Sequence, residues 1–125
     1  MGQLTHYAKS LEALVAKDGR YPLLAYGLVM ASLNQTISRL DQPRHITGQE
    51  LAEGFRQFVL EQFGPMRLSV LERWNIHSTE ELGTIVFNLI EIGLLMKTPG
   101  DRLEDFQGLY TFQDAFGGPY NYLPQ

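Results

Sequence analysis

The chain has 125 residues, a net charge of −4, 44% hydrophobic and 19% charged residues, and no cysteine. This composition predicts a single globular domain and excludes an intrinsically disordered chain, disulfides and thiolate chemistry. The amino terminus lacks the basic region and apolar run of a signal peptide, and the longest apolar run, around residues 23–31, is too short to span a bilayer. We therefore expect a cytoplasmic protein with no membrane partner.

Charge is distributed unevenly along the chain. Residues 1–74 contain eight Lys or Arg and seven Asp or Glu, a net charge of +1. Residues 75–125 contain two and seven, a net charge of −5. An acidic half repels phosphate backbones, so the charge pattern disfavours nucleic acid as a partner.

Two helices are predicted in the amino-terminal third. Apolar residues recur at helical spacing over residues 4–17, and an Asp-Gly pair at 18–19 ends that helix. The second helix is predicted over residues 22–40, because a proline can open it and its apolar stripe is wide enough to pack on two sides. A break at 41–43 leads into the middle of the chain.

Two capping boxes organise the middle of the chain. A Thr-x-x-Glu box at 47–50 starts a helix that Gly-Pro at 64–65 ends. A Ser-x-x-Glu box at 78–81 starts a longer helix, predicted over 80–96, and a short helix over 65–74 lies between them. Two capped helices across a short turn are typical of a helix-turn-helix.

Short segments with strand composition flank these three helices. We predict strands at 44–46, 96–98 and 109–112, with a Pro-Gly-Asp turn at 99–101 between the last two. One strand, three helices and a two-stranded wing is the element order of a winged helix-turn-helix.

The fold class predicted from these elements is mainly α, formally α+β, with two helices before a winged helix-turn-helix-like core at about residues 44–112. A compact all-α bundle is the alternative if the strands do not pair. Residues 1–116 are predicted to form the single globular domain, with the aromatic segment 106–116 folded back onto it. Residues 117–125 are predicted to be a flexible tail.

Four strings of residues resemble a known family. They are residues 44–51 (RHITGQEL), 61–66 (EQFGPM), 83–89 (GTIVFNL) and 105–106 (DF). In these strings the chain resembles an uncharacterised family of small bacterial proteins from planctomycetes and verrucomicrobia, over roughly residues 20–116. Asn75 stands where a glycine is expected after the tryptophan, which affects only the turn. The resemblance implies a family but no activity, cofactor or functional residue.

His45, Glu50 and Glu53 are the nearest approach to a polar site in the sequence. A histidine and two carboxylates near a helix start could bind a small ligand or a metal, or transfer protons. Their spacing matches no metal motif, and Glu50 is already needed for the capping box, so we expect neither metal nor cofactor. The Ser and Thr residues, including those of the neighbouring pairs Thr5-His6 and His77-Ser78, are predicted at caps or on helices rather than in a nucleophile–base pattern, so the sequence favours a non-enzymatic protein.

The third helix of the core would be the recognition helix of a DNA-binding domain. It offers Glu80, Glu81 and Glu91 and no positive charge before Lys97, which opposes contact with phosphates. In this alternative, the residues that could contact nucleic acid are Arg56, Arg67, Arg73 and Arg102.

Apolar and aromatic side chains favour a protein partner or self-association. Phe87 and Ile92 extend the apolar surface of the third helix beyond one stripe, and Tyr120 and Tyr122 lie in the tail. These four residues are the candidate contacts of a protein–protein interaction domain. Nucleic-acid binding and a small-ligand or metal site near His45 are the alternative functions.

Overall fold

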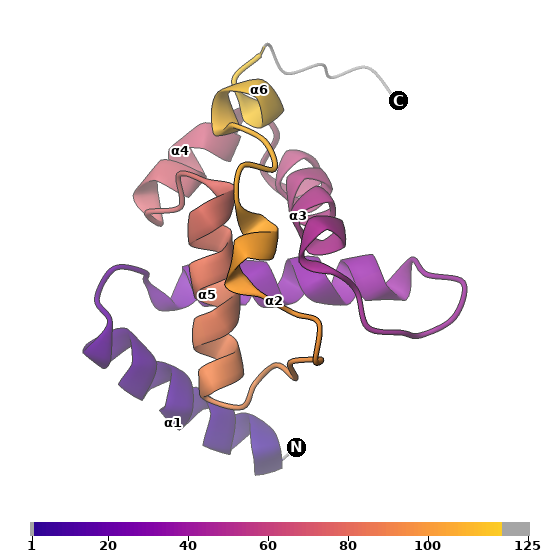
Figure 1. Ribbon diagram of the computed structural model, residues 1–125. Helices are drawn as coiled ribbons and strands as arrows, with labels where there is room; N and C mark the ends of the chain where they lie inside the picture. Colours follow the sequence, from indigo (N-terminus) through magenta and orange to yellow (C-terminus); the bar gives the residue numbers. More distant parts are fainter. Residues whose placement is uncertain (1, 119–125) are drawn as a thin grey trace.

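Helices and their connecting loops make up the computed structural model, which describes residues 2–118, with side chains from residue 9 onward (Figure 1). The mainly helical fold predicted from the sequence is confirmed, and the all-α alternative fits the described residues. The helices, with η denoting a short 3-10 helix, are α1 (Gly2–Lys17), α2 (Leu23–Ser38), α3 (Gly48–Phe63), η1 (Gly64–Met66), α4 (Arg67–Arg73), α5 (Thr79–Glu91), η2 (Leu103–Phe106) and α6 (Phe112–Phe116).

The three predicted strands, at 44–46, 96–98 and 109–112, are absent from residues 2–118, so the β-wing is a wrong prediction there. In the last of these segments the Thr111 hydroxyl accepts a hydrogen bond from the Asp114 N–H at 3.1 Å and starts α6 instead. Capping and packing thus override the strand propensity of this segment.

Both predicted capping sites start helices. The Thr47 hydroxyl accepts a hydrogen bond from the Glu50 N–H at 3.0 Å, and the Glu50 carboxylate accepts one from the Thr47 N–H at 2.9 Å. The Ser78 hydroxyl accepts from the Glu81 N–H at 3.2 Å, but the Glu81 carboxylate accepts from the His77 N–H, at 2.9 Å. In the second box the carboxylate therefore caps the N–H of the residue before Ser78 and not that of Ser78 itself.

Left-handed residues follow α4 and α5. Asn75, after α4, has a φ of 65°, a conformation that favours glycine. Gly93, with a φ of 84°, follows α5, which ends at Glu91 rather than near Met96 as predicted. The chain then continues as a loop past the end of α5.

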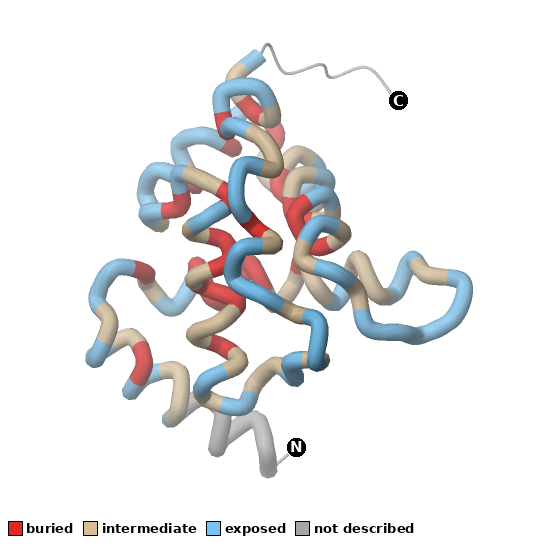
Figure 2. The backbone as a smooth tube through the Cα atoms, in the orientation of Figure 1, coloured by how far each residue is buried: buried red, intermediate tan, exposed pale blue. Residues whose placement is uncertain are grey.

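Helix α5 lies at the centre of the fold, where it contacts α2, α3 and η2 (Figure 1). Buried residues line the inner faces of these helices, and exposed ones lie on the outside (Figure 2). The largest fully buried side chains are Tyr21, Tyr26, Phe55, Phe116, Leu71, Ile76, Leu82, Ile85, Leu89, Val29, Val59 and Thr79.

Helices α2 and α3 approach each other at a glycine. A Cβ added to Gly54 would lie 1.9 Å from the Thr36 Oγ1, so for a larger residue either the Thr36 side chain must turn away or the helices must move apart. We expect Gly54→Ala to lower the free energy of unfolding by about 1–3 kcal/mol through overpacking. Urea denaturation followed by circular dichroism measures this change.

The same substitution at Gly27 is the matched control for that prediction. Gly27 is an exposed glycine of α2, and an added Cβ would have nothing within 4 Å. Gly27→Ala should raise the free energy of unfolding by about 1 kcal/mol, because alanine favours the helix. Equal effects of the two substitutions would contradict the close contact between α2 and α3.

The aromatic segment after α5 folds back onto the helices, as predicted. Phe106, Phe112 and Phe116 are 2%, 9% and 1% exposed, and the rings of the last two make an edge-to-face contact at 5.1 Å. Of the predicted flexible tail, residues 117 and 118 are described here, and the rest, 119–125, lies outside the described residues.

Candidate functional site

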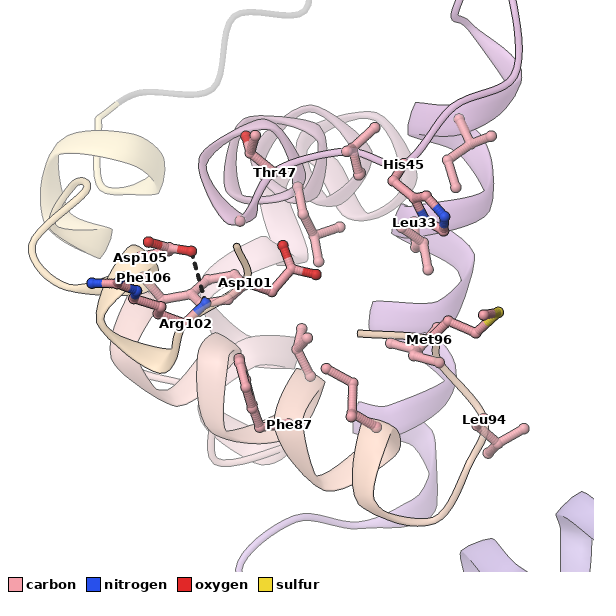
Figure 3. A pocket seen from close by; sticks show the side chains of 17 residues that line it. Leu33, His45, Thr47, Phe87, Leu94, Met96, Asp101, Arg102, Asp105 and Phe106 are labelled. Carbon is pink, nitrogen blue, oxygen red and sulfur yellow. Dashed lines mark hydrogen bonds between the residues drawn. The ribbon is translucent and has the colours of Figure 1, made fainter. Parts of the chain in front are cut away.

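A pocket of about 260 Å³ opens between α2, the start of α3 and α5 (Figure 3). The loop after α5 and the η2 turn close its other side. The lining is mostly apolar, and its apolar members are Leu33, Ile37, Ile46, Leu51, Val86, Phe87, Ile90, Leu94, Leu95, Met96 and Phe106.

Phe106 forms a wall of the pocket and sits between two glycines. A Cβ added to Gly48 of α3 would lie 3.0 Å from the Phe106 ring, and one added to Gly83 of α5 would lie 2.8 Å from it. Any side chain at Gly83 would displace the ring, and one at Gly48 would crowd it. The shape of the pocket therefore depends on both glycines.

Polar groups stand at the mouth of the pocket. Figure 3 shows Asp101 directed toward the cavity and the guanidinium of Arg102 directed away from it, with His45 on the opposite rim. The Asp101 carboxylate accepts a hydrogen bond from the Thr98 N–H at 2.8 Å, and the Asp105 carboxylate accepts one from the Arg102 N–H at 3.0 Å. The pocket thus combines an apolar floor with carboxylates at its edge.

The polar site predicted around His45, Glu50 and Glu53 does not form as a unit. Arg44 donates hydrogen bonds to Glu50 at 3.0 and 2.8 Å, and Arg56 donates to Glu53 at 3.0 and 2.6 Å. The Arg44 bonds, followed by the capping N–H, lower the pKa of Glu50 to about 2, and Arg56 lowers the pKa of Glu53. Of the three predicted residues, His45 lines the pocket.

A metal site near His45 finds no support in the described part of the chain. Among these residues, no group of three or more His, Asp or Glu side chains is placed to hold a metal ion.

Arg67, predicted as a possible nucleic-acid contact, is buried instead. It is 6% exposed and donates hydrogen bonds to the carbonyl oxygens of Phe116 at 2.6 Å, Gly64 at 3.0 Å and Gly118. This guanidinium fastens α6 to the start of α4, so it is not available to a phosphate. The prediction is therefore wrong for Arg67.

The other three candidate arginines have separate settings. Arg56 of α3 is paired with Glu53, Arg73 ends α4, and Arg102 precedes η2. Arg73 and Arg102 are exposed. The four arginines therefore differ in their settings: one is buried, one is paired with a carboxylate and two are exposed on different elements.

The candidate interaction residues Phe87 and Ile92 face different surfaces. Phe87 is half-buried and lines the pocket, whereas Ile92 lines a separate groove between α5 and α1. Tyr120 and Tyr122 lie outside the described residues. The structure therefore separates the two described candidates and places Phe87 at the pocket.

Most residues of the pocket, Met96, Asp101 and Phe106 among them, do not stand out as site residues in the sequence. The sequence predicts Met96 in a strand, Asp101 in a turn and Phe106 in the folded-back aromatic segment. A usable signal was the pair of glycines, Gly48 and Gly83, inside helical patterns, because such glycines often mark a close approach of another element.

A second cluster of titratable groups joins the start of α2 to the turn before α5. The Tyr21 hydroxyl donates a hydrogen bond to Glu81 at 3.0 Å, and the His77 ring lies 3.2 Å from Glu81 and 3.1 Å from Glu72. Burial, followed by the bond to Glu81, raises the pKa of Tyr21. These contacts connect the turn before α2 to α4 and α5.

No protein-family model, curated protein or solved structure matches this chain. No helix among the described residues is long and apolar enough to cross a membrane.

Proposed function

We propose that this chain is a protein-interaction domain that binds a partner through the pocket between α2, α3 and α5. The observation that carries the proposal is an apolar cavity that opens at the surface beside Met96, which is 81% exposed. Leu103, on the neighbouring η2 turn, is also exposed. Apolar side chains around an open cavity are suited to receive a buried interface residue from a partner.

The polar groups around the pocket support binding rather than catalysis. The Thr47 hydroxyl caps α3, and the carboxylates of Asp101 and Asp105 accept backbone hydrogen bonds. Nucleophilic catalysis needs a hydroxyl or thiol held against a base. The groups at this mouth are used to fix the loop and the helix start.

The helix order supports a scaffold related to the helix-turn-helix. Helices α4 and α5 are joined by a short turn at residues 74–78, as in that motif. Phosphate recognition would require exposed and unpaired arginines, and the burial of Arg67 and the pairing of Arg56 weigh against it. We propose that α3 and α5 of this arrangement serve to build the pocket.

We also propose that the chain belongs to the family of small proteins from planctomycetes and verrucomicrobia. Three of the strings that carry the resemblance, at 44–51, 83–89 and 105–106, come together where Phe106 packs between two glycines. Strings that meet in one contact support a shared structural unit.

The proposed function can be tested with peptides that are selected from a random phage-displayed library for binding to the full chain. The affinity of these peptides is then measured for the unmodified chain and for two variants. Met96→Gln removes an exposed apolar side chain at the pocket, and Leu24→Gln, at a residue that is 61% exposed on α2, is the matched control. We expect binding to weaken about tenfold in Met96→Gln, as for an interface residue worth about 1.4 kcal/mol, and to be unchanged in Leu24→Gln. Selected peptides that bind Met96→Gln as tightly as the unmodified chain would contradict the proposal.

A further inference from the structure

We infer that the partner presents a basic amphipathic helix, with apolar side chains in the pocket and Lys or Arg side chains beside Asp101. This inference rests on the proposed function and adds the chemistry of the partner.

The surroundings of the pocket favour a helix over an extended peptide. The walls come from α2, α3 and α5, from the loop after α5 and from the η2 turn, and none of residues 2–118 forms a strand. The described part of the chain therefore offers no sheet edge to which an extended peptide could add. A groove between helices instead receives apolar side chains at positions i, i+3, i+4 and i+7 of a partner helix.

The loop at the mouth of the pocket is acidic. Asp101 and Asp105 supply two carboxylates among the residues that line the pocket, and Glu104 lies between them in the sequence. The guanidinium of Arg102 is directed away from the cavity, and Lys97 is not among the residues that line it (Figure 3). A partner that enters the pocket therefore meets negative charge first.

Because of this negative charge, a partner that docks in the pocket must supply a compensating positive charge. Asp101 and Asp105 are already half-buried, and a docked helix would remove more of the water around them. A carboxylate covered without a compensating charge is destabilising, and a Lys or Arg placed beside it offsets that cost. The net charge of −5 in residues 75–125 attracts a basic partner at longer range.

The selected peptides provide the test, through their sequences and through two charge variants of the chain. Asp101→Asn removes the charge but keeps an oxygen that can accept from the Thr98 N–H. Asp114→Asn makes the same change on α6, at an exposed residue that does not line the pocket. We expect helical peptides with Lys or Arg flanking their apolar residues, and an affinity about fivefold lower for Asp101→Asn alone.

The outcomes separate this inference from the proposed function. Peptides that need Met96 but carry neutral or acidic flanks, and that bind Asp101→Asn unchanged, would overturn the basic helix and leave the pocket as the binding site. A selection that yields no peptide sensitive to Met96→Gln would overturn both.

Discussion

Replacing Phe106 with alanine should lower the free energy of unfolding by about 3–5 kcal/mol, the usual cost of deleting a buried aromatic ring. Phe106 is 2% exposed, and its ring lies against Gly48 and Gly83. Neither glycine has a side chain that could move into the space, so the cavity would persist. Chemical denaturation of the variant, followed by circular dichroism, gives the change directly.

The control for Phe106 lies in the same short helix. Leu103 is 45% exposed, so Leu103→Ala should change the free energy of unfolding by no more than about 0.5 kcal/mol. If the two substitutions had similar effects, the ring of Phe106 would not be the side chain that joins α3 to α5.

Replacing Arg67 with alanine should lower the free energy of unfolding by about 3 kcal/mol. This is a large effect for a charged residue at the start of a helix. Its guanidinium donates to the carbonyl oxygens of Phe116, Gly64 and Gly118. Hydrogen bonds from a charged donor are stronger than neutral ones, and alanine would leave buried carbonyl oxygens without them. Thermal and chemical denaturation would both report the loss.

Arg73→Ala is the matched control for Arg67, because it removes an arginine from the other end of α4. Arg73 is exposed, so its removal should change stability by no more than about 0.5 kcal/mol. Arg67→Lys should restore little of the stability that Arg67→Ala loses, since an ammonium group lacks the planar guanidinium geometry that reaches several carbonyl oxygens. An Arg67→Ala variant as stable as Arg73→Ala would show that α6 is not fastened by this side chain.

The helices could be predicted because their signals are local. The Thr47 and Ser78 caps act within one turn, and apolar spacing marks the buried faces of α3 and α5. The apolar pattern predicts an end of α5 near Met96, which is too late, because the pattern continues past Gly93, where the backbone turns. The strand predicted at 109–112 is wrong because residue composition alone does not show that Thr111 caps a helix.

The candidate site was only partly predictable. Phe87 and His45 are candidates from the sequence, and both line the pocket. Phe87 belongs to its wall and not to a surface shared with Ile92, and His45 lies on its rim without Glu50 and Glu53. The pocket depends on Phe106 reaching α5 from a loop, which is a long-range contact. The sequence predicts that Arg67 is an exposed arginine. Its burial depends on carbonyl oxygens about fifty residues away along the chain.

A titration of the methyl-labelled full chain with a selected basic peptide, followed by NMR, tests the pocket most directly. If the pocket is the binding site, the largest shifts should fall on methyl groups that line it, those of Leu33, Ile37, Ile46, Ile90 and Leu94. The exposed residues Leu23, Leu24 and Leu68, on α2 and α4, should be unaffected. Shifts concentrated on those three residues would contradict binding at the pocket.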